Sequence, residues 1–152
     1  MLEWTRFFPP ASHAQIELFE RDTGISLPPR YKSFLLSLNG GQPCKDMAFG
    51  ISEISEKVIL GALYGISDEE DNTLNVATVY VDFKDDIPTD FIPIGEDPGG
   101  NLLLLATTGK EKEEIFFWDR VGFLAKRTGK RMFHITGNID DFLESLQPIP
   151  DT

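Results

Sequence analysis

The stretch LPPRYKSFLLSLNGG, from Leu27 to Gly41, predicts one short helix with sharply defined ends. Two prolines open it, and proline fits a first helical turn because the N–H it lacks would have no helical partner there. Spacing of i, i+3, i+4 and i+7 puts four apolar side chains on one face: Tyr31, Phe34, Leu35 and Leu38. The helix is expected to end at three residues that tolerate positive φ: Asn39, Gly40 and Gly41.

A preceding helix is predicted over residues 12–22. Ser12 is a suitable N-cap, and Gln15 three residues later completes a capping box. Gly24 follows where a left-handed residue ends a helix. The chain therefore begins with two helices joined by a short turn.

Two later segments also have helical periodicity. Residues 76–83 carry apolar side chains at i, i+3, i+4 and i+7, with Asn72 as the expected cap. Residues 139–146 repeat the pattern, and Pro148 is expected to stop that helix.

Between the helices the period changes to that of strands. The turn at 96–100 has the Pro-Gly-Gly composition of a tight reversal, and residues 122–136 are expected to add one more hairpin. Short apolar segments bounded by glycine or charged residues are read as strands: 47–54, 57–67, 90–95, 101–107 and 113–119.

This order of elements predicts an α+β fold. Runs of strands with short connections favour a central, mostly antiparallel sheet, flanked here by about four helices. The length of 152 residues suits a single domain over residues 1–152, and neither an internal repeat nor a linker is evident.

Composition excludes several classes of function. The net charge is −11, from 14 Lys and Arg against 25 Asp and Glu, so nucleic-acid and membrane surfaces would be repelled. No apolar run approaches the roughly 20 residues of a membrane span, and the N-terminus lacks the features of a signal peptide. Because Cys44 is the single cysteine, no intramolecular disulfide can form, and a cytoplasmic protein is expected.

The ordered landmarks along about 120 residues resemble the SUKH superfamily, which includes fungal regulators of cell-wall glucan synthesis and bacterial immunity proteins. The strand segment that ends in Trp118 and Asp119, and the C-terminal FLESL helix, extend the resemblance. The remaining matching landmarks are Leu27, Pro28, Tyr31, Phe34, Asn39, Gly40, Gly41, Phe91, Ile92, Pro93, Ile94, Gly95, Gly99 and Gly100.

The resemblance implies a mixed α+β fold and a binding role without catalytic activity. It implies for bacterial members the neutralisation of toxin domains, often nucleases, by direct binding, and for fungal members a scaffold role. Two positions depart from the family pattern: Asn101 stands where an aspartate is usual, and Arg120 follows Asp119. A chemistry shared through those side chains would be lost here, whereas a role in turns would not.

Enzymatic signals are weak. His13 and His134 lie far apart without metal-ligand spacing, so His13 is interpreted as a surface residue and His134 as a structural one. Cys44 lies in a loop beside Lys45, which is little evidence of an activated thiol. The glycine-rich loop at 95–101 is read as a turn, because a strand follows it and two acidic residues would repel phosphate. No metal or cofactor is predicted.

Acidic segments are the stronger candidates for a binding surface. They are either solvated faces or a surface that steers and holds a basic partner, and the sequence leaves both interpretations open. The candidate partner-binding acids are Asp68, Glu69, Glu70, Asp71, Asp82, Asp85, Asp86, Glu96 and Asp97, with Asp90 close by.

Three aromatic residues are candidate interface anchors, since interfaces favour Tyr and Trp. Tyr64 is next to a glycine in a predicted loop, which makes it the preferred candidate, with Tyr80 as another. Trp118 alternates with Phe116 on one strand face and is interpreted as a core residue.

Two hypotheses of function follow. The first is a cytoplasmic immunity protein that captures a cognate basic toxin domain, of nuclease type, through acidic loops and the exposed side of the sheet. The alternative is a scaffold or regulatory module without a toxin partner, as in fungal cell-wall synthesis. The sequence predicts neither the identity of the partner nor the oligomeric state.

Overall fold

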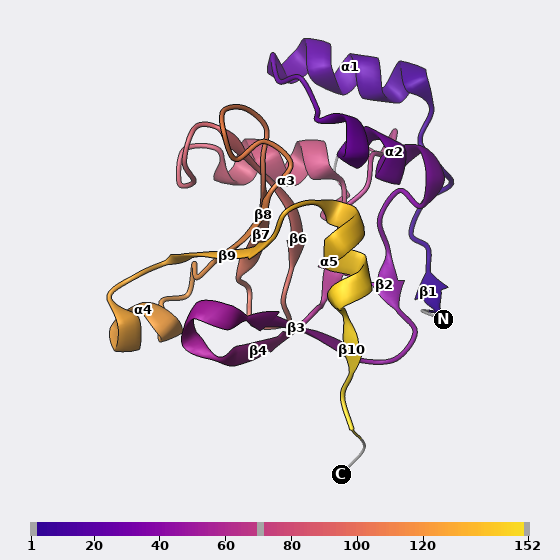
Figure 1. The fold of residues 1–152 in the computed structure, drawn as a ribbon. Coiled ribbons are helices and arrows are strands. Elements are labelled where there is room, and N and C mark those ends of the chain that lie inside the picture. The colour runs from indigo at the N-terminus through magenta and orange to yellow at the C-terminus, as the bar shows by residue number, and fades with distance from the viewer. Residues whose placement is uncertain (1–2, 70–71, 151–152) are drawn as a thin grey trace.

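A computed structural model describes residues 3–69 and 72–150 of the chain (Figure 1). Its largest sheet has five strands in the order β5-β6-β7-β8-β9, and each neighbouring pair is antiparallel. With helices packed around it, this sheet confirms the predicted α+β class. Its strands are β5 (Ala62–Leu63), β6 (Phe91–Glu96), β7 (Leu102–Ala106), β8 (Ile115–Trp118) and β9 (Met132–Thr136).

Two smaller antiparallel sheets accompany the large one. A three-stranded sheet has the order β10-β3-β4, and a two-stranded sheet pairs β1 with β2. A short 3-10 helix, Ser52–Ile54, joins β3 to β4. The strands are β1 (Trp4–Thr5), β2 (Gln42–Pro43), β3 (Met47–Ile51), β4 (Glu56–Ile59) and β10 (Gln147–Pro148).

Figure 1 shows α1, α2 and α3 at one end of the molecule, with α4 and the β3–β4 hairpin toward the other. The predicted capping box of α1 is present: Gln15 N donates to Ser12 Oγ (3.1 Å) and Ser12 N donates to Gln15 Oε1 (2.9 Å). Gly24 ends the helix in the left-handed region. The described helices are α1 (His13–Thr23), α2 (Pro29–Ser37), α3 (Val76–Phe83), α4 (Phe123–Thr128) and α5 (Ile139–Ser145).

The expected hairpin over 122–136 is wrong in its first half, where the chain forms α4. The buried carboxylate of Asp119 favours that helix, because it accepts hydrogen bonds from Gly122 N (3.1 Å) and Ala125 N (2.7 Å). Such bonds satisfy N–H groups that a short helix otherwise leaves unpaired. The second half is a strand as predicted, but β9 pairs with β8, the strand before α4, rather than with residues 122–128.

Two other helix ends differ from prediction by a few residues. The cap of α3 is Asn75, whose Oδ1 accepts from Ala77 N, whereas Asn72 instead accepts from Leu74 N (2.8 Å) in the preceding turn. Helix α5 ends at Ser145, and Pro148 lies beyond it in β10. At α3 two asparagines of N-cap type, Asn72 and Asn75, lie three positions apart, and the later one caps the helix.

The main core lies between the inner face of the large sheet, the three-stranded sheet, α2 and α5. Phe49 of β3 connects these layers, since its ring lies 6.0 Å from that of Phe117 and 5.2 Å from that of Phe142. A smaller cluster covers the outer face of the large sheet, where Ile87 packs beside Leu104 and Phe116. The large sheet is therefore apolar on both faces.

One buried side chain joins three segments of the chain. Asn39, 1 % exposed, donates through Nδ2 to Pro9 O (2.8 Å) and Ile66 O (2.9 Å), and its Oδ1 accepts from Ile66 N (2.8 Å). The backbone of Asn39 has φ 55°, a left-handed conformation that asparagine tolerates better than most residues. The end of α2 is thereby bonded to the entry into α1 and to the segment after β5.

Close backbone approach at this point requires glycine. A Cβ at Gly65 would lie 2.1 Å from Asn39 O, and one at Gly40 would lie 2.7 Å from Leu63 O. Gly40 also has φ 84°, which favours glycine. The Asn-Gly-Gly sequence therefore ends α2 and packs it against the strand that follows β4.

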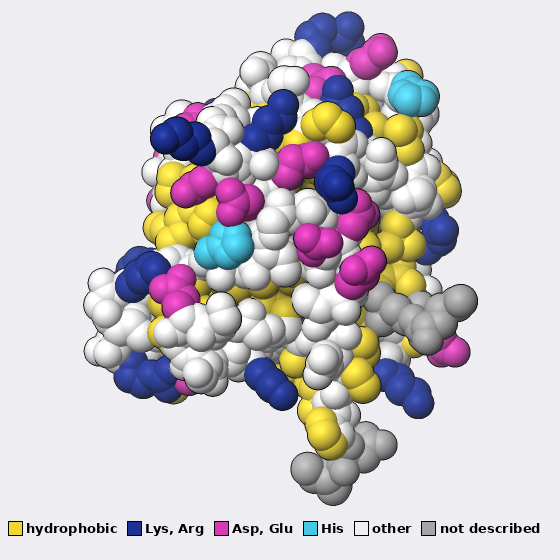
Figure 2. All heavy atoms as spheres, in the orientation of Figure 1, with side chains coloured by type: hydrophobic (Ala, Val, Ile, Leu, Met, Phe, Trp, Pro, Cys, Tyr) yellow, Lys and Arg dark blue, Asp and Glu magenta, His cyan; other side chains and the backbone are white. Residues whose placement is uncertain are grey.

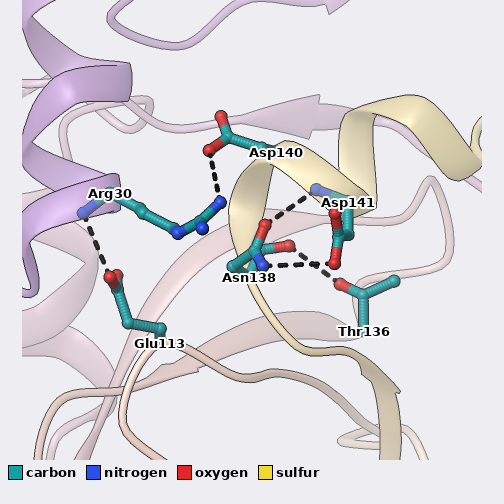
Figure 3. Close-up of polar contacts among 6 residues, drawn as sticks. All are labelled: Arg30, Glu113, Thr136, Asn138, Asp140 and Asp141. Carbon is teal, nitrogen blue, oxygen red and sulfur yellow. Dashed lines mark hydrogen bonds and ion pairs between the residues drawn. The ribbon is translucent and has the colours of Figure 1, made fainter.

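The N-terminus of α2 is capped by a residue from a distant loop (Figure 3). Pro28, the N-cap, offers no side-chain bond, and Glu113 Oε2 accepts from Arg30 N (3.1 Å) in its place. The Arg30 side chain in turn pairs with Asp140 at the start of α5 (3.2 Å). The cap hydrogen bond that Pro28 cannot supply to α2 thus comes from a carboxylate 83 residues from Arg30 in sequence.

Replacing Asn39 by glycine removes the linking side chain without straining the backbone. We expect Asn39→Gly to lower the free energy of unfolding by about 3 kcal/mol, because the buried amide and two carbonyls lose their partners. Denaturant unfolding followed by circular dichroism measures this. Ser33→Ala, at an exposed position of α2, is the control and should change stability by less than about 0.5 kcal/mol. Equal stability of Asn39→Gly and the wild type would contradict the assignment.

Candidate functional site

A groove of about 480 Å³ lies between α1 and α3. Helix α1 contributes one face, from Gln15 to Asp22, and α3 contributes Ala77 to Asp82. Between them runs the segment after β5, where Gln15 Nε2 donates to Asp68 Oδ1 (3.0 Å). The buried Asn39 side chain is hydrogen-bonded to the backbone of Ile66, which itself lines the groove, so Asn39 also helps to position this groove.

The lining of this groove combines exposed apolar side chains with acidic ones. Leu18 is 47 % exposed and Val81 is 62 % exposed, which is unusual for side chains of their type. Three carboxylates accompany them: Asp22, Asp68 and Asp82. Among the described residues no Lys or Arg lines it, and we name this feature the acidic groove.

Of the nine acids predicted from sequence, Asp68 and Asp82 meet in the acidic groove. Asp85 and Asp86 are exposed just beyond α3, and Glu69 is exposed after Asp68. Two more lie at the end of β6, where Glu96 is half-buried and Asp97, just beyond the strand, is buried. Glu70 and Asp71 lie outside the described residues.

Asp97 is bound within its own turn and is not a surface acid. It is 9 % exposed, and its carboxylate accepts from Asn101 N (2.8 Å) and Asn101 Nδ2 (3.0 Å). Its oxygens are already hydrogen-bonded inside the protein, and the contact with a partner stays a prediction for Asp97.

The two positions that depart from the family pattern serve the same turn. Asn101 Oδ1 accepts from Val121 N (3.0 Å), and Arg120 Nε donates to Gly100 O (2.8 Å). The Arg120 guanidinium also lies over the ring of Phe83, 5.4 Å from its centroid. These side chains join the β6–β7 turn to the segment that precedes α4.

Tyr64 is buried rather than exposed in a loop, and its role as an interface anchor stays a prediction. It is 2 % exposed and belongs to the main core, where its backbone N donates to Ile94 O (2.8 Å). Burial raises the pKa of its phenol, and the nearby Glu96 carboxylate raises that pKa further. The neighbouring Gly65 indicated a loop at Tyr64, whereas Tyr64 directly follows β5 at a buried edge of the large sheet.

The interpretation of Trp118 as a packed residue agrees with the structure. It faces the smaller cluster on the outer side of the sheet with Phe116, opposite Leu102 and Met132 on the neighbouring strands. Trp118 remains half-buried.

The histidines and the cysteine are separate from the acidic groove. His13 is exposed at the start of α1, and His134 Nε2 pairs with Glu114 Oε1 at 2.7 Å on β9 and its neighbouring loop. Cys44 is exposed, with its Sγ 3.3 Å from Thr5 Oγ1. Within residues 3–69 and 72–150, no three His, Cys, Asp or Glu side chains are grouped as a metal site requires.

Three groove residues were not identified from the sequence. Leu18 lies off the buried stripe of α1, and Asp22 was read only as part of that helix. Val81 lies on the outward side of α3. A hydrophobic residue outside the apolar stripe of an amphipathic helix was the available signal.

Comparison with known families agrees with this fold. The model of the SMI1 / KNR4 family (SUKH-1) matches residues 10–145, and the chain therefore belongs to this family. The resemblance to the SUKH superfamily is thus confirmed. A search of the curated proteins found no match. In the described part of the chain, no helix has the length and apolar character to cross a membrane.

Tyr64 allows a test of the buried position by alkaline titration. Its pKa is raised in the folded chain, whereas an unfolded tyrosine ionises near about pH 10. The protonated Tyr64 phenol therefore stabilises the folded chain fully below about pH 10, and this stabilisation is lost as the pH rises above that value. We expect the Tyr64 contribution to absorbance at 295 nm to appear only together with loss of near-UV circular dichroism.

Tyr64→Phe is the matched control for this titration. It removes the ionisable group and should make stability less dependent on pH above about 10. The rise in absorbance at 295 nm that Tyr64→Phe removes is the signal of Tyr64. If the wild type shows this rise while its near-UV circular dichroism is unchanged, the buried position of Tyr64 is wrong.

Proposed function

We propose that the chain is a cytoplasmic binding protein of the immunity type, which neutralises a cognate basic toxin domain by direct, stoichiometric binding in the acidic groove. The observation that supports this most is the combination of exposed Leu18 and Val81 with three carboxylates in one groove. Membership of the SUKH-1 family is in keeping with a binding role.

The chemistry of the groove suits a basic protein surface. A toxin that cleaves nucleic acid presents Lys and Arg to phosphate, and carboxylates of an inhibitor attract the same side chains. Leu18 and Val81 supply apolar area that water leaves on binding, which gives affinity beyond the charge contacts. Inhibition then follows from occupation of the toxin's substrate-binding surface, and no catalytic step in this chain is needed.

The net charge of −11 contributes to the rate of association rather than to the fold. A long-range negative potential steers a basic partner toward the chain, and the effect weakens as salt screens it. Charge pairs at the groove also discriminate between cognate and non-cognate toxins, since an unmatched charge is costly.

The scaffold hypothesis remains the second candidate. It is favoured by the half-buried aromatic cluster around Trp118, which offers another contact surface on the outer face of the sheet. A scaffold would bind several cellular proteins weakly instead of one toxin tightly. Binding stoichiometry and affinity separate the two proposals.

Neutralising the three groove carboxylates tests the immunity proposal. The probe is the catalytically inactive C-terminal domain of a toxin-like protein encoded beside this gene, titrated by calorimetry at low and moderate salt. We expect one-to-one binding that weakens with salt. Combined Asp22→Asn, Asp68→Asn and Asp82→Asn should weaken it by about tenfold or more at low salt.

The matched control is Asp85→Asn with Asp86→Asn, which removes exposed charge near α3 but outside the groove lining. This variant should bind within about threefold of the wild type. Equal losses from both variants would mean that net charge, not the groove, carries binding. Absence of binding by the wild type at either salt would refute the immunity proposal.

A further inference from the structure

A second exposed apolar surface lies at the α4 end of the molecule, away from the acidic groove. Phe123 is 73 % exposed, Val121 is 59 % exposed and Ile59 is 38 % exposed. A cleft of about 340 Å³ separates β4 from α4, with Ile59 on one wall and Phe123 on the other. We name this feature the β4–α4 cleft.

One wall of the cleft is an open strand edge. Within the described residues, β4 is the outer strand of its sheet and pairs only with β3. Leu60 N donates to Met47 O (2.9 Å), and the antiparallel alternation then directs the backbone groups of Lys57 and Ile59 away from β3. All four residues of β4 line the cleft, so these outward groups are available to another strand.

The charge around this cleft is opposite to that of the whole chain. Residues 120–131 hold five Lys and Arg and neither Asp nor Glu, although the chain has a net charge of −11. Arg127 pairs with Glu56, and Lys130 pairs with Glu53 on the β3–β4 hairpin. Asp97 and Asp119 also line the cleft, but both are buried and their oxygens accept hydrogen bonds from backbone N–H groups of the protein. Lys57 in the lining and Lys126 beside it are exposed, so the exposed charge at the rim of the cleft is basic.

Figure 2 shows this charge arrangement on one face of the molecule. Basic side chains lie around the lobe that Figure 1 identifies as α4 and the β3–β4 hairpin. Acidic side chains are more frequent over the middle of the same face, near α5. On this face, the lobe with α4 therefore differs in charge from the middle of the molecule.

We propose that the β4–α4 cleft is a second binding site, which takes an extended acidic segment of a partner protein as an added strand on β4. The outward N–H and C=O groups of Lys57 and Ile59 pair with the backbone of that segment. Its apolar side chains pack against Ile59 and Phe123, and its carboxylates meet Lys57 and Lys126. A strand fits better than a helix here, because the open edge offers backbone groups in a row.

The β4–α4 cleft does not depend on the immunity proposal, since the two sites share no lining residue. A protein with both sites can hold a basic partner at one end and an acidic one at the other. The basic end also recognises acidic tails, which accompany many proteins as flexible segments.

The test uses the full chain, labelled with ¹⁵N, and two peptides of eight residues. One alternates valine with glutamate, and the other alternates valine with lysine at the same length. We expect the acidic peptide to shift the amide signals of β4 and α4, and to slow hydrogen exchange at the amides of Lys57 and Ile59. We expect the basic peptide to shift signals of α1 and α3 instead.

Two variants test the contacts. Phe123→Ser removes exposed apolar area, and Lys57→Glu reverses charge on the strand edge, so each should weaken the acidic peptide by about tenfold. Val81→Ser, in the acidic groove, is the control and should leave acidic-peptide binding within twofold. Intact amide spectra of all three variants show that the fold is retained.

Several outcomes would overturn the β4–α4 proposal. These are acidic-peptide shifts outside β4 and α4, equal binding of both peptides at the cleft, and unchanged exchange at Lys57 and Ile59. Dimerisation of the chain that covers β4, or binding to anionic lipid vesicles through Phe123 in place of the acidic peptide, would assign the surface to another occupant. If only the basic peptide fails to bind, the groove proposal fails and the cleft proposal stands.

Discussion

The hydrogen bonds of the buried Asn39 side chain are the constraint on which the arrangement of the molecule depends. They join the end of α2 to Pro9, which precedes α1, and to Ile66, which precedes α3. Since α1 and α3 form the walls of the acidic groove, a single buried amide is bonded to the segments that precede both walls. The scaffold and the candidate site are therefore coupled through backbone contacts rather than through charge.

The charged groups divide into those that build turns and those that face solvent. The carboxylates of Asp97 and Asp119 accept hydrogen bonds from backbone N–H groups. Asp97 thereby stabilises the β6–β7 turn, and Asp119 stabilises the start of α4. Asp68 and Asp82 remain at the surface beside exposed apolar side chains. Only carboxylates of the second kind retain the solvent exposure that recognition of a partner requires, which is why the total count of acids overstates the size of the candidate interface.

Local signals predicted the helices well because their information is contained within a few residues. Ser12 with Gln15, and the left-handed Asn-Gly-Gly sequence, determine ends of α1 and α2 without help from the rest of the chain. The segment before β9 was misjudged because Asp119, lying outside the segment first considered, caps α4 through tertiary placement. Glu113 capping α2 from 83 residues away was equally beyond local reasoning.

The candidate site was harder to predict than the fold. Two of the predicted acids meet in the acidic groove, but their proximity depends on how the segment after β5 lies beside α3, which no spacing in the sequence encodes. Tyr64 was misplaced because a short apolar strand with flanking glycines has the composition of a loop. Leu18 and Val81 are recognised as surface residues only once the buried faces of their helices are known.

The most direct test of capture in the acidic groove is hydrogen–deuterium exchange of the chain, alone and in complex with a tightly bound basic toxin domain. We expect added protection of the backbone amides in residues 15–22, 66–69 and 76–83, the segments that line or adjoin the acidic groove. Protection confined to the outer face of β7–β9, with exchange in those three segments unchanged, would contradict the central claim that the acidic groove is the capture site.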